Sequence, residues 1–175
     1  MVTSICVDED DFKVDPDNGR LQLNHHYVQN SPESFTFTLD GTNDVFEKVT
    51  DFDDVTILVD GYYIVTMDAH GNAINTEAGP GTVVATSVSA QLRVNNAPVA
   101  GTETMLIHNS QGNPSTTEPA LQLHGTGSCT RVLFLVAGDD LSLWGKRNSD
   151  AGTVTEILSN DDGRCRITAA RISGI

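Results

Sequence analysis

Turn-forming residues interrupt this chain at intervals of about ten residues, which leaves room for short strands but not for long helices. Asp40-Gly41, Asp60-Gly61 and Asn95-Asn96 are pairs that favour tight turns. No segment long enough for a stable helix keeps an apolar period of 3.6 residues without glycine, proline or β-branched residues. The spacing therefore predicts an all-β protein with almost no helix.

Between these turns lie short runs rich in valine, isoleucine, threonine and aromatic residues, which favour strands. The run at 62–67 is expected to close at residues 69–72, and a glycine break is expected at Gly125 and Gly127, after the run at 121–123. Many short strands at this spacing indicate an antiparallel two-sheet sandwich. The expected strands span residues 35–39, 55–59, 62–67, 83–94, 104–107, 121–123, 130–137, 141–144, 153–158 and 165–172.

The chain has 175 residues, which fits one domain with an additional arm. Residues 1–40 are predicted to form an N-terminal arm or attachment region. A turn over residues 15–19, followed by Leu21 and Leu23, suggests a small hairpin within it. Residues 41–175 are predicted to form the sandwich domain.

The formal net charge of −14 excludes several classes of partner. A nucleic-acid-binding protein needs a basic face to neutralise phosphates, and a protein that binds an anionic membrane surface needs one as well. The longest apolar run, residues 132–137, is far too short to span a bilayer. The acidic start predicts that no signal peptide is present, and the odd count of 3 cysteines predicts synthesis in a reducing cytoplasm without a disulfide framework.

Metal binding is not expected, although two arrangements suggest it. His25 and His26 lie near Asp15 and Asp17, but adjacent side chains on a strand point to opposite sides and cannot share one ion there. The loop carboxylates at 51–54, 139–140 and 161–162 could supply some calcium ligands, and solvated turns are the favoured interpretation. Three further histidines are each next to a turn and are expected to be solvated: His70, His108 and His124.

No catalytic or cofactor motif is present, and the chain is not expected to be an enzyme. Residues 125–129 lack the pattern and the following helix of a nucleophile elbow. Cys129 and Cys165 are interpreted as small buried hydrophobic residues. Paired acids for glycoside hydrolysis would be distant in the chain, so the sequence leaves that alternative open. Trp144, the one tryptophan, could stack on a sugar but is better explained as the edge of a core.

Several segments together resemble the C1q/tumour-necrosis-factor-like jelly roll over residues 45–175. They are GYYIV at 61–65, LRVNN at 92–96, LFLVAGDDLSL at 133–143 and RITAARI at 166–172. Val65 departs from the family pattern, which usually has an aromatic residue there. The resemblance implies a jelly-roll homotrimer in which one sheet of each protomer faces the threefold axis. Core and trimer-axis packing would then involve Tyr63, Val65, Leu133, Leu135, Ile167 and Ile172.

An acidic jelly roll with an N-terminal arm is similar to virion surface proteins of tailed bacteriophages. That similarity implies a capsid decoration, cement or head-fibre protein, made in the host cytoplasm, whose arm binds the major capsid protein. The alternatives are a tail-fibre tip that recognises a host-surface glycan through loops 72–82 and 109–119, and a secreted bacterial C1q-like domain. The residues expected to attach to the capsid are Phe12, Val14, Leu21, Leu23 and Tyr27.

Overall fold

The computed structural model describes residues 13–14, 21–22, 27–32, 34–75, 83–112, 121–149, 153–160 and 164–173. Within these ranges the chain forms strands, bridged by turns and bends, and contains no helix. The prediction of an all-β protein is confirmed. Nowhere in these ranges is there a helix long and apolar enough to cross a membrane.

The strands form two antiparallel six-stranded sheets and one short hairpin. The hairpin joins β1 (Lys13–Val14) to β2 (Leu21–Gln22). The first sheet contains β5 (Glu47–Lys48), β6 (Val55–Thr56), β8 (Val83–Val94), β9 (Ala97–Pro98), β10 (Thr104–Gly112) and β12 (Asp140–Ser149). The second sheet contains β3 (Tyr27–Asn30), β4 (Ser34–Thr38), β7 (Gly61–Asn75), β11 (Leu121–Leu135), β13 (Thr153–Asn160) and β14 (Arg166–Ser173).

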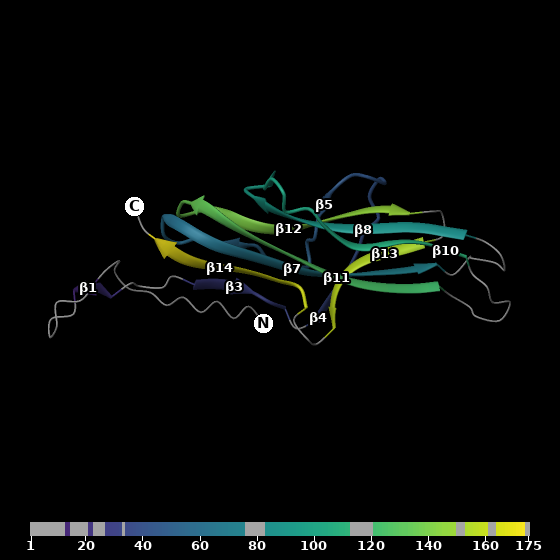
Figure 1. The fold of residues 1–175 in the computed structure, drawn as a ribbon, viewed down its shortest axis with the longest axis horizontal. Coiled ribbons are helices and arrows are strands. Elements are labelled where there is room, and N and C mark those ends of the chain that lie inside the picture. The colour runs from purple at the N-terminus through teal and green to yellow at the C-terminus, as the bar shows by residue number, and fades with distance from the viewer. Residues whose placement is uncertain are drawn as a thin grey trace.

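The chain alternates between the two sheets as it proceeds, which is the jelly-roll arrangement. It passes from β6 in the first sheet to β7 in the second, and from β10 in the first to β11 in the second. It then returns to the first sheet with β12 and ends in the second with β13 and β14. Figure 1 shows the long strands β7, β8 and β11 running along the longest axis of the molecule. The predicted jelly-roll sandwich is therefore confirmed.

The second sheet includes strands from the region that the sequence assigned to the arm. β3 pairs with β14, and β4 pairs with β13 in a register that places Phe37 opposite Ile157. Phe35 and Phe37 pack against the core with one face of β4, which explains why this segment joins the sandwich. β3 and β4 thus belong to the second sheet, on the N-terminal side of the boundary predicted at residue 40.

The core lies between the sheets and takes alternate residues of each strand. In β7, Tyr63, Val65 and Met67 have no exposed side-chain area, whereas Tyr62 and Ile64, which alternate with them, are exposed. Ile167 from β14 and Leu135 from β11 join the same buried cluster. The residues predicted for core and trimer packing therefore include four that fill the core of a single protomer: Tyr63, Val65, Leu135 and Ile167.

Three glycines that were expected to break strands instead lie inside long, continuous strands. Gly71 belongs to β7, and Gly125 and Gly127 belong to β11, which pairs with β7 along its whole length. A Cβ atom on Gly125 would lie 1.8 Å from the Leu106 carbonyl oxygen, and one on Gly71 would lie 3.1 Å from the Leu106 side chain. The glycines are needed because β10 of the first sheet approaches the second sheet closely at Leu106.

Tyr63 provides a test of the core. Its hydroxyl donates a hydrogen bond of 2.6 Å to the Val59 carbonyl oxygen while its ring is fully buried. We expect Tyr63→Phe to keep the fold and lower the free energy of unfolding by about 1–2 kcal/mol, because the carbonyl loses its partner. Urea unfolding measures this loss, and Tyr62→Phe, at an exposed position, is the matched control. Equal stability of both variants would contradict the prediction.

Candidate functional site

Exposed apolar side chains gather on the outer face of the second sheet. Tyr62 and Phe134 are 47% and 44% exposed, and their rings meet edge to face with centroids 5.3 Å apart. Ile64 lies opposite Val132 in the next cross-strand pair, and Val132 is 59% exposed. Ile172 of β14 is also exposed, beside the Ser173–Tyr62 pair. We call these five residues the apolar patch: Tyr62, Ile64, Val132, Phe134 and Ile172.

Of the residues predicted for trimer packing, Ile172 is the one in the apolar patch. Leu133 is half-buried and packs against the core, together with the four fully internal residues described above. The sequence missed the patch because residues 62–65 are apolar at every position, so the usual alternation gives no sign of which face is outside. In β7, for example, the outer face carries Tyr62 and Ile64, which are the sequence neighbours of the predicted residues Tyr63 and Val65.

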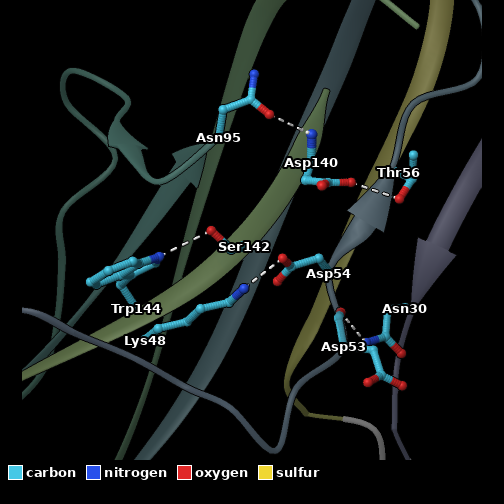
Figure 2. A network of polar contacts seen from close by, with 9 residues as sticks. All are labelled: Asn30, Lys48, Asp53, Asp54, Thr56, Asn95, Asp140, Ser142 and Trp144. Atoms are coloured by element: carbon cyan, nitrogen blue, oxygen red, sulfur yellow. Dashed lines mark hydrogen bonds and ion pairs between the residues drawn. The ribbon is translucent and has the colours of Figure 1, made fainter. Parts of the chain in front are cut away.

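The loop carboxylates are engaged in hydrogen bonds within the protein (Figure 2). Asp140 accepts a hydrogen bond of 2.7 Å from the Thr56 hydroxyl, and its backbone N–H donates to Asn95 Oδ1 at 3.0 Å. Asp54 forms a 2.6 Å ion pair with Lys48. The Thr56 contact ties β6 to β12, and the Asn95 contact ties the turn after β8 to β12. The ion pair links β5 to the segment that leads to β6.

In the part of the chain that the structure describes, no group of three or more potential ligands could hold a metal ion. The aspartates at 15, 17, 161 and 162, with His25 and His26, lie outside the described residues. The hydrogen bonds of Asp54 and Asp140 instead give these two carboxylates a structural role.

His70 corrects one prediction. It was expected beside a turn and solvated, but β7 continues to residue 75, so His70 lies in mid-strand and is only 3% exposed. Its ring stacks on that of His124, with centroids 5.7 Å apart and planes 13° apart. His124 and His108 are exposed, as expected, but they lie within β11 and β10 and not beside a turn.

Cys129 and Cys165, which were predicted to be buried, differ in their degree of burial. Cys165 is fully buried, and its thiol donates a hydrogen bond to the Leu158 carbonyl oxygen at 3.2 Å. Cys129 is half-buried in β11, and desolvation raises the pKa of its thiol above the ordinary value. A raised pKa leaves less thiolate at neutral pH, which is unsuited to a nucleophile. Cys6 is outside the described residues.

Trp144 forms part of a stack on the first sheet. The Arg93 guanidinium lies 4.0 Å from the centre of the Trp144 ring system and 5.5 Å from that of Phe46. The indole N–H donates to the Ser142 hydroxyl at 3.0 Å. The ring is half-buried, and the guanidinium lies against one side of it.

The stack predicts a spectroscopic change. We expect Arg93→Ala to shift Trp144 fluorescence to longer wavelength, because water replaces the guanidinium, and to lower stability by about 1 kcal/mol or less. Trp144 is the single tryptophan, so its emission spectrum reports this site alone. Arg131→Ala is the matched control, since Arg131 is exposed and donates to the Gly101 carbonyl oxygen instead. An unchanged spectrum in Arg93→Ala would refute the stack.

Of the residues predicted for capsid attachment, Val14, Leu21 and Tyr27 lie on strands that the structure describes. Val14 and Leu21 are paired in the β1–β2 hairpin, and Tyr27 is paired with Ala170 in the second sheet. Phe12 and Leu23 lie outside the described residues, as do 76–82 and 113–119 of the loops proposed for glycan contacts, whereas residues 72–75 belong to β7 and are not loop. Residues 109–112 belong to β10 and are not loop.

Comparison with known proteins adds only a distant structural likeness. No protein-family model matches the chain, and no curated protein does. Among solved structures, the chain is similar to "Structure of Eiger TNF from S. frugiperda", with 17% sequence identity and a TM-score of 0.41. The match covers 86% of this chain and 92% of that chain. These values are too low to transfer a function from that protein.

Proposed function

We propose that this chain is a non-enzymatic structural protein that assembles as a homotrimer through the outer face of the second sheet. The observation that carries the proposal is the apolar patch. Its five side chains are 39–59% exposed and contiguous on β7, β11 and β14. Contiguous exposed apolar surface of this kind marks an interaction site, because monomers rarely leave it in water.

Further copies of this chain are the partners that the patch fits. A chain with a net charge of −14 repels itself, so copies approach most favourably through a face without charged side chains. The five residues of the patch carry no charge, and the edge-to-face aromatic pair among them is typical of the buried centre of an interface. The threefold symmetry follows from the resemblance to C1q/tumour-necrosis-factor-like proteins, whose protomers turn one sheet towards the axis.

The trimer's biological role in this proposal is that of a capsid decoration or head-fibre protein on a bacteriophage shell. The support is the similarity of an acidic jelly roll with an N-terminal arm to virion surface proteins. Since β3 and β4 belong to the sandwich, attachment to the major capsid protein falls to the segment before β3. Phe12, Val14, Leu21 and Leu23 remain the candidates for that contact.

Light scattering across a dilution series tests the assembly. We expect a stable mass near three times 18.7 kDa, and a mass of 18.7 kDa at all concentrations would overturn the trimer. Co-sedimentation with phage heads tests the role. The full chain should sediment with the heads, whereas a chain that begins at residue 27 should remain trimeric in the supernatant. Adherence to host cells without binding to heads would favour the tail-fibre alternative instead.

A further inference from the structure

The outer face of the first sheet carries an arginine without a carboxylate partner among the described residues. In β8, Leu92 fills the core, so its neighbour Arg93 points away from the core. Arg93 donates from Nε to Gln91 Oε1 at 3.1 Å and from Nη1 to the Asn96 carbonyl oxygen at 3.2 Å, and both acceptors are neutral. The chain has 24 acidic and 10 basic residues, yet none of the described acids pairs with this cation.

Two lysines on neighbouring strands, by contrast, are neutralised within the protein. Lys146 of β12 forms a 2.9 Å ion pair with Glu103, and Lys48 of β5 forms the 2.6 Å pair with Asp54. The positive charge that remains at this place on the first sheet is therefore that of the Arg93 guanidinium. A half-buried charge without a counter-ion is costly, so a ligand that supplies a carboxylate gains a charge-assisted hydrogen bond there.

Two aromatic rings hold the guanidinium in place. Its central carbon lies 4.0 Å from the centre of the Trp144 ring system and 5.5 Å from that of Phe46. Desolvation lowers the pKa of Arg93, but a guanidinium stays protonated at neutral pH. Its Nη2 group donates to no described residue, so these N–H donors remain available. A guanidinium that is stacked on rings loses little freedom on binding, which suits it to recognise a planar carboxylate.

The surroundings of Arg93 have the composition of the centre of a protein–protein interface. Such centres are enriched in aromatic residues, methionine and arginine. The two rings are half-buried, and Met105 of β10 is 56% exposed. Met105 lies on the same face of the first sheet, because its register partner Ser89 also pairs with Lys146. This set of side chains therefore suits a protein partner.

We propose that the surface formed by Arg93, Trp144, Phe46 and Met105 binds a segment of a partner protein in which one aspartate or glutamate lies between apolar residues. The carboxylate accepts hydrogen bonds from the available N–H groups of Arg93, and the apolar residues pack on the rings and on Met105. One carboxylate is favoured because Arg93 supplies one positive charge, whereas a chain with a net charge of −14 repels a polyanion. The surface lies on the opposite side of the sandwich from the apolar patch, so the proposal requires neither the trimer nor the virion role.

Titration of the full-length protein with the peptide acetyl-Leu-Asp-Leu-amide, followed by the fluorescence of the single tryptophan Trp144, tests the proposal. We expect a dissociation constant on the order of 1 mM, as suits a short peptide on an open surface. The neutral peptide acetyl-Leu-Asn-Leu-amide should bind at least about tenfold more weakly. Equal binding of the two peptides would refute recognition of the carboxylate. Tighter binding of D-glucuronate than of the aspartate peptide would overturn the proposal in favour of an acidic sugar.

Variants of Arg93 locate the binding, and calorimetry measures it because a change at Arg93 also alters the emission of Trp144. Arg93→Gln should weaken binding of the aspartate peptide at least about tenfold, and Arg93→Lys, which keeps the charge but not the planar fork, should restore only part of it. Arg131→Gln, at an exposed arginine of β11 in the second sheet, should not change it. Circular dichroism confirms that each variant is folded. Unchanged affinity in a folded Arg93→Gln protein, or no titration by the peptide in the parent, would overturn the proposal.

Discussion

Replacing Phe134 with glutamate is expected to dissociate the proposed trimer into monomers of 18.7 kDa. Phe134 is 44% exposed and contacts Tyr62 within the apolar patch, so the fold of one protomer does not depend on its ring. In the trimer the ring is buried, and each interface would have to bury a carboxylate without a partner, at a cost of several kcal/mol. Light scattering at micromolar concentration measures the change in mass.

Met105→Glu is the matched control for this experiment. Met105 is 56% exposed and lies on β10 of the first sheet, away from the apolar patch. It should keep the mass of the parent protein. A Phe134→Glu protein that remains folded and trimeric would show that the outer face of the second sheet is not the interface. The trimer would then have to assemble through a different surface.

Gly125→Ala is expected to cause a larger loss of stability than the other substitutions proposed for the strands. The new Cβ would lie 1.8 Å from the Leu106 carbonyl oxygen and 2.8 Å from its carbonyl carbon, which are backbone atoms that no rotamer change can move. β10 must therefore shift away from β11. Overpacking of this severity costs about 3 kcal/mol, which for a chain of this size lowers the melting temperature by about 10 °C.

Gly138→Ala separates steric overlap from backbone strain. Gly138 has a φ of 93°, and nothing lies within 4 Å of the position that a Cβ would take there, so the substitution costs only about 1 kcal/mol of conformational strain. Urea unfolding at one fixed protein concentration, followed by Trp144 fluorescence, compares the two variants. Equal stability of Gly125→Ala and Gly138→Ala would contradict the close approach of the two sheets at Leu106.

Local patterns predicted much of the fold because strands and turns depend on neighbouring residues. Residues 83–94 were expected as one strand and form β8 with the same ends. The Asn95-Asn96 turn was expected from residues that accept positive φ, and both adopt it, at 50° and 66°. The expectation of strand breaks failed at Gly71, Gly125 and Gly127. These glycines allow the backbone to approach Leu106 closely, and Leu106 is distant in sequence from each of them.

The candidate sites were less predictable because they depend on which face of a strand lies outside. The trimer residues were chosen from the correct strands, yet Tyr63 and Val65 point into the core and Tyr62 and Ile64 point out. A strand that is apolar on both faces does not reveal its orientation, since alternation is the only local signal. The outer face likewise brings together residues from separate strands, such as Asp68 of β7 between Ser128 of β11 and Arg166 of β14.

The sequence by itself determined the all-β class, the positions of most turns and the acidic character that disfavours nucleic acid as a partner. These properties follow from local backbone preference and from summed charge, neither of which needs a fold. Only the tertiary structure decided which strands pair, that β3 and β4 join the second sheet, and that the apolar patch lies on its outer face. Such features arise from contacts between residues far apart in the chain, and no local pattern encodes them.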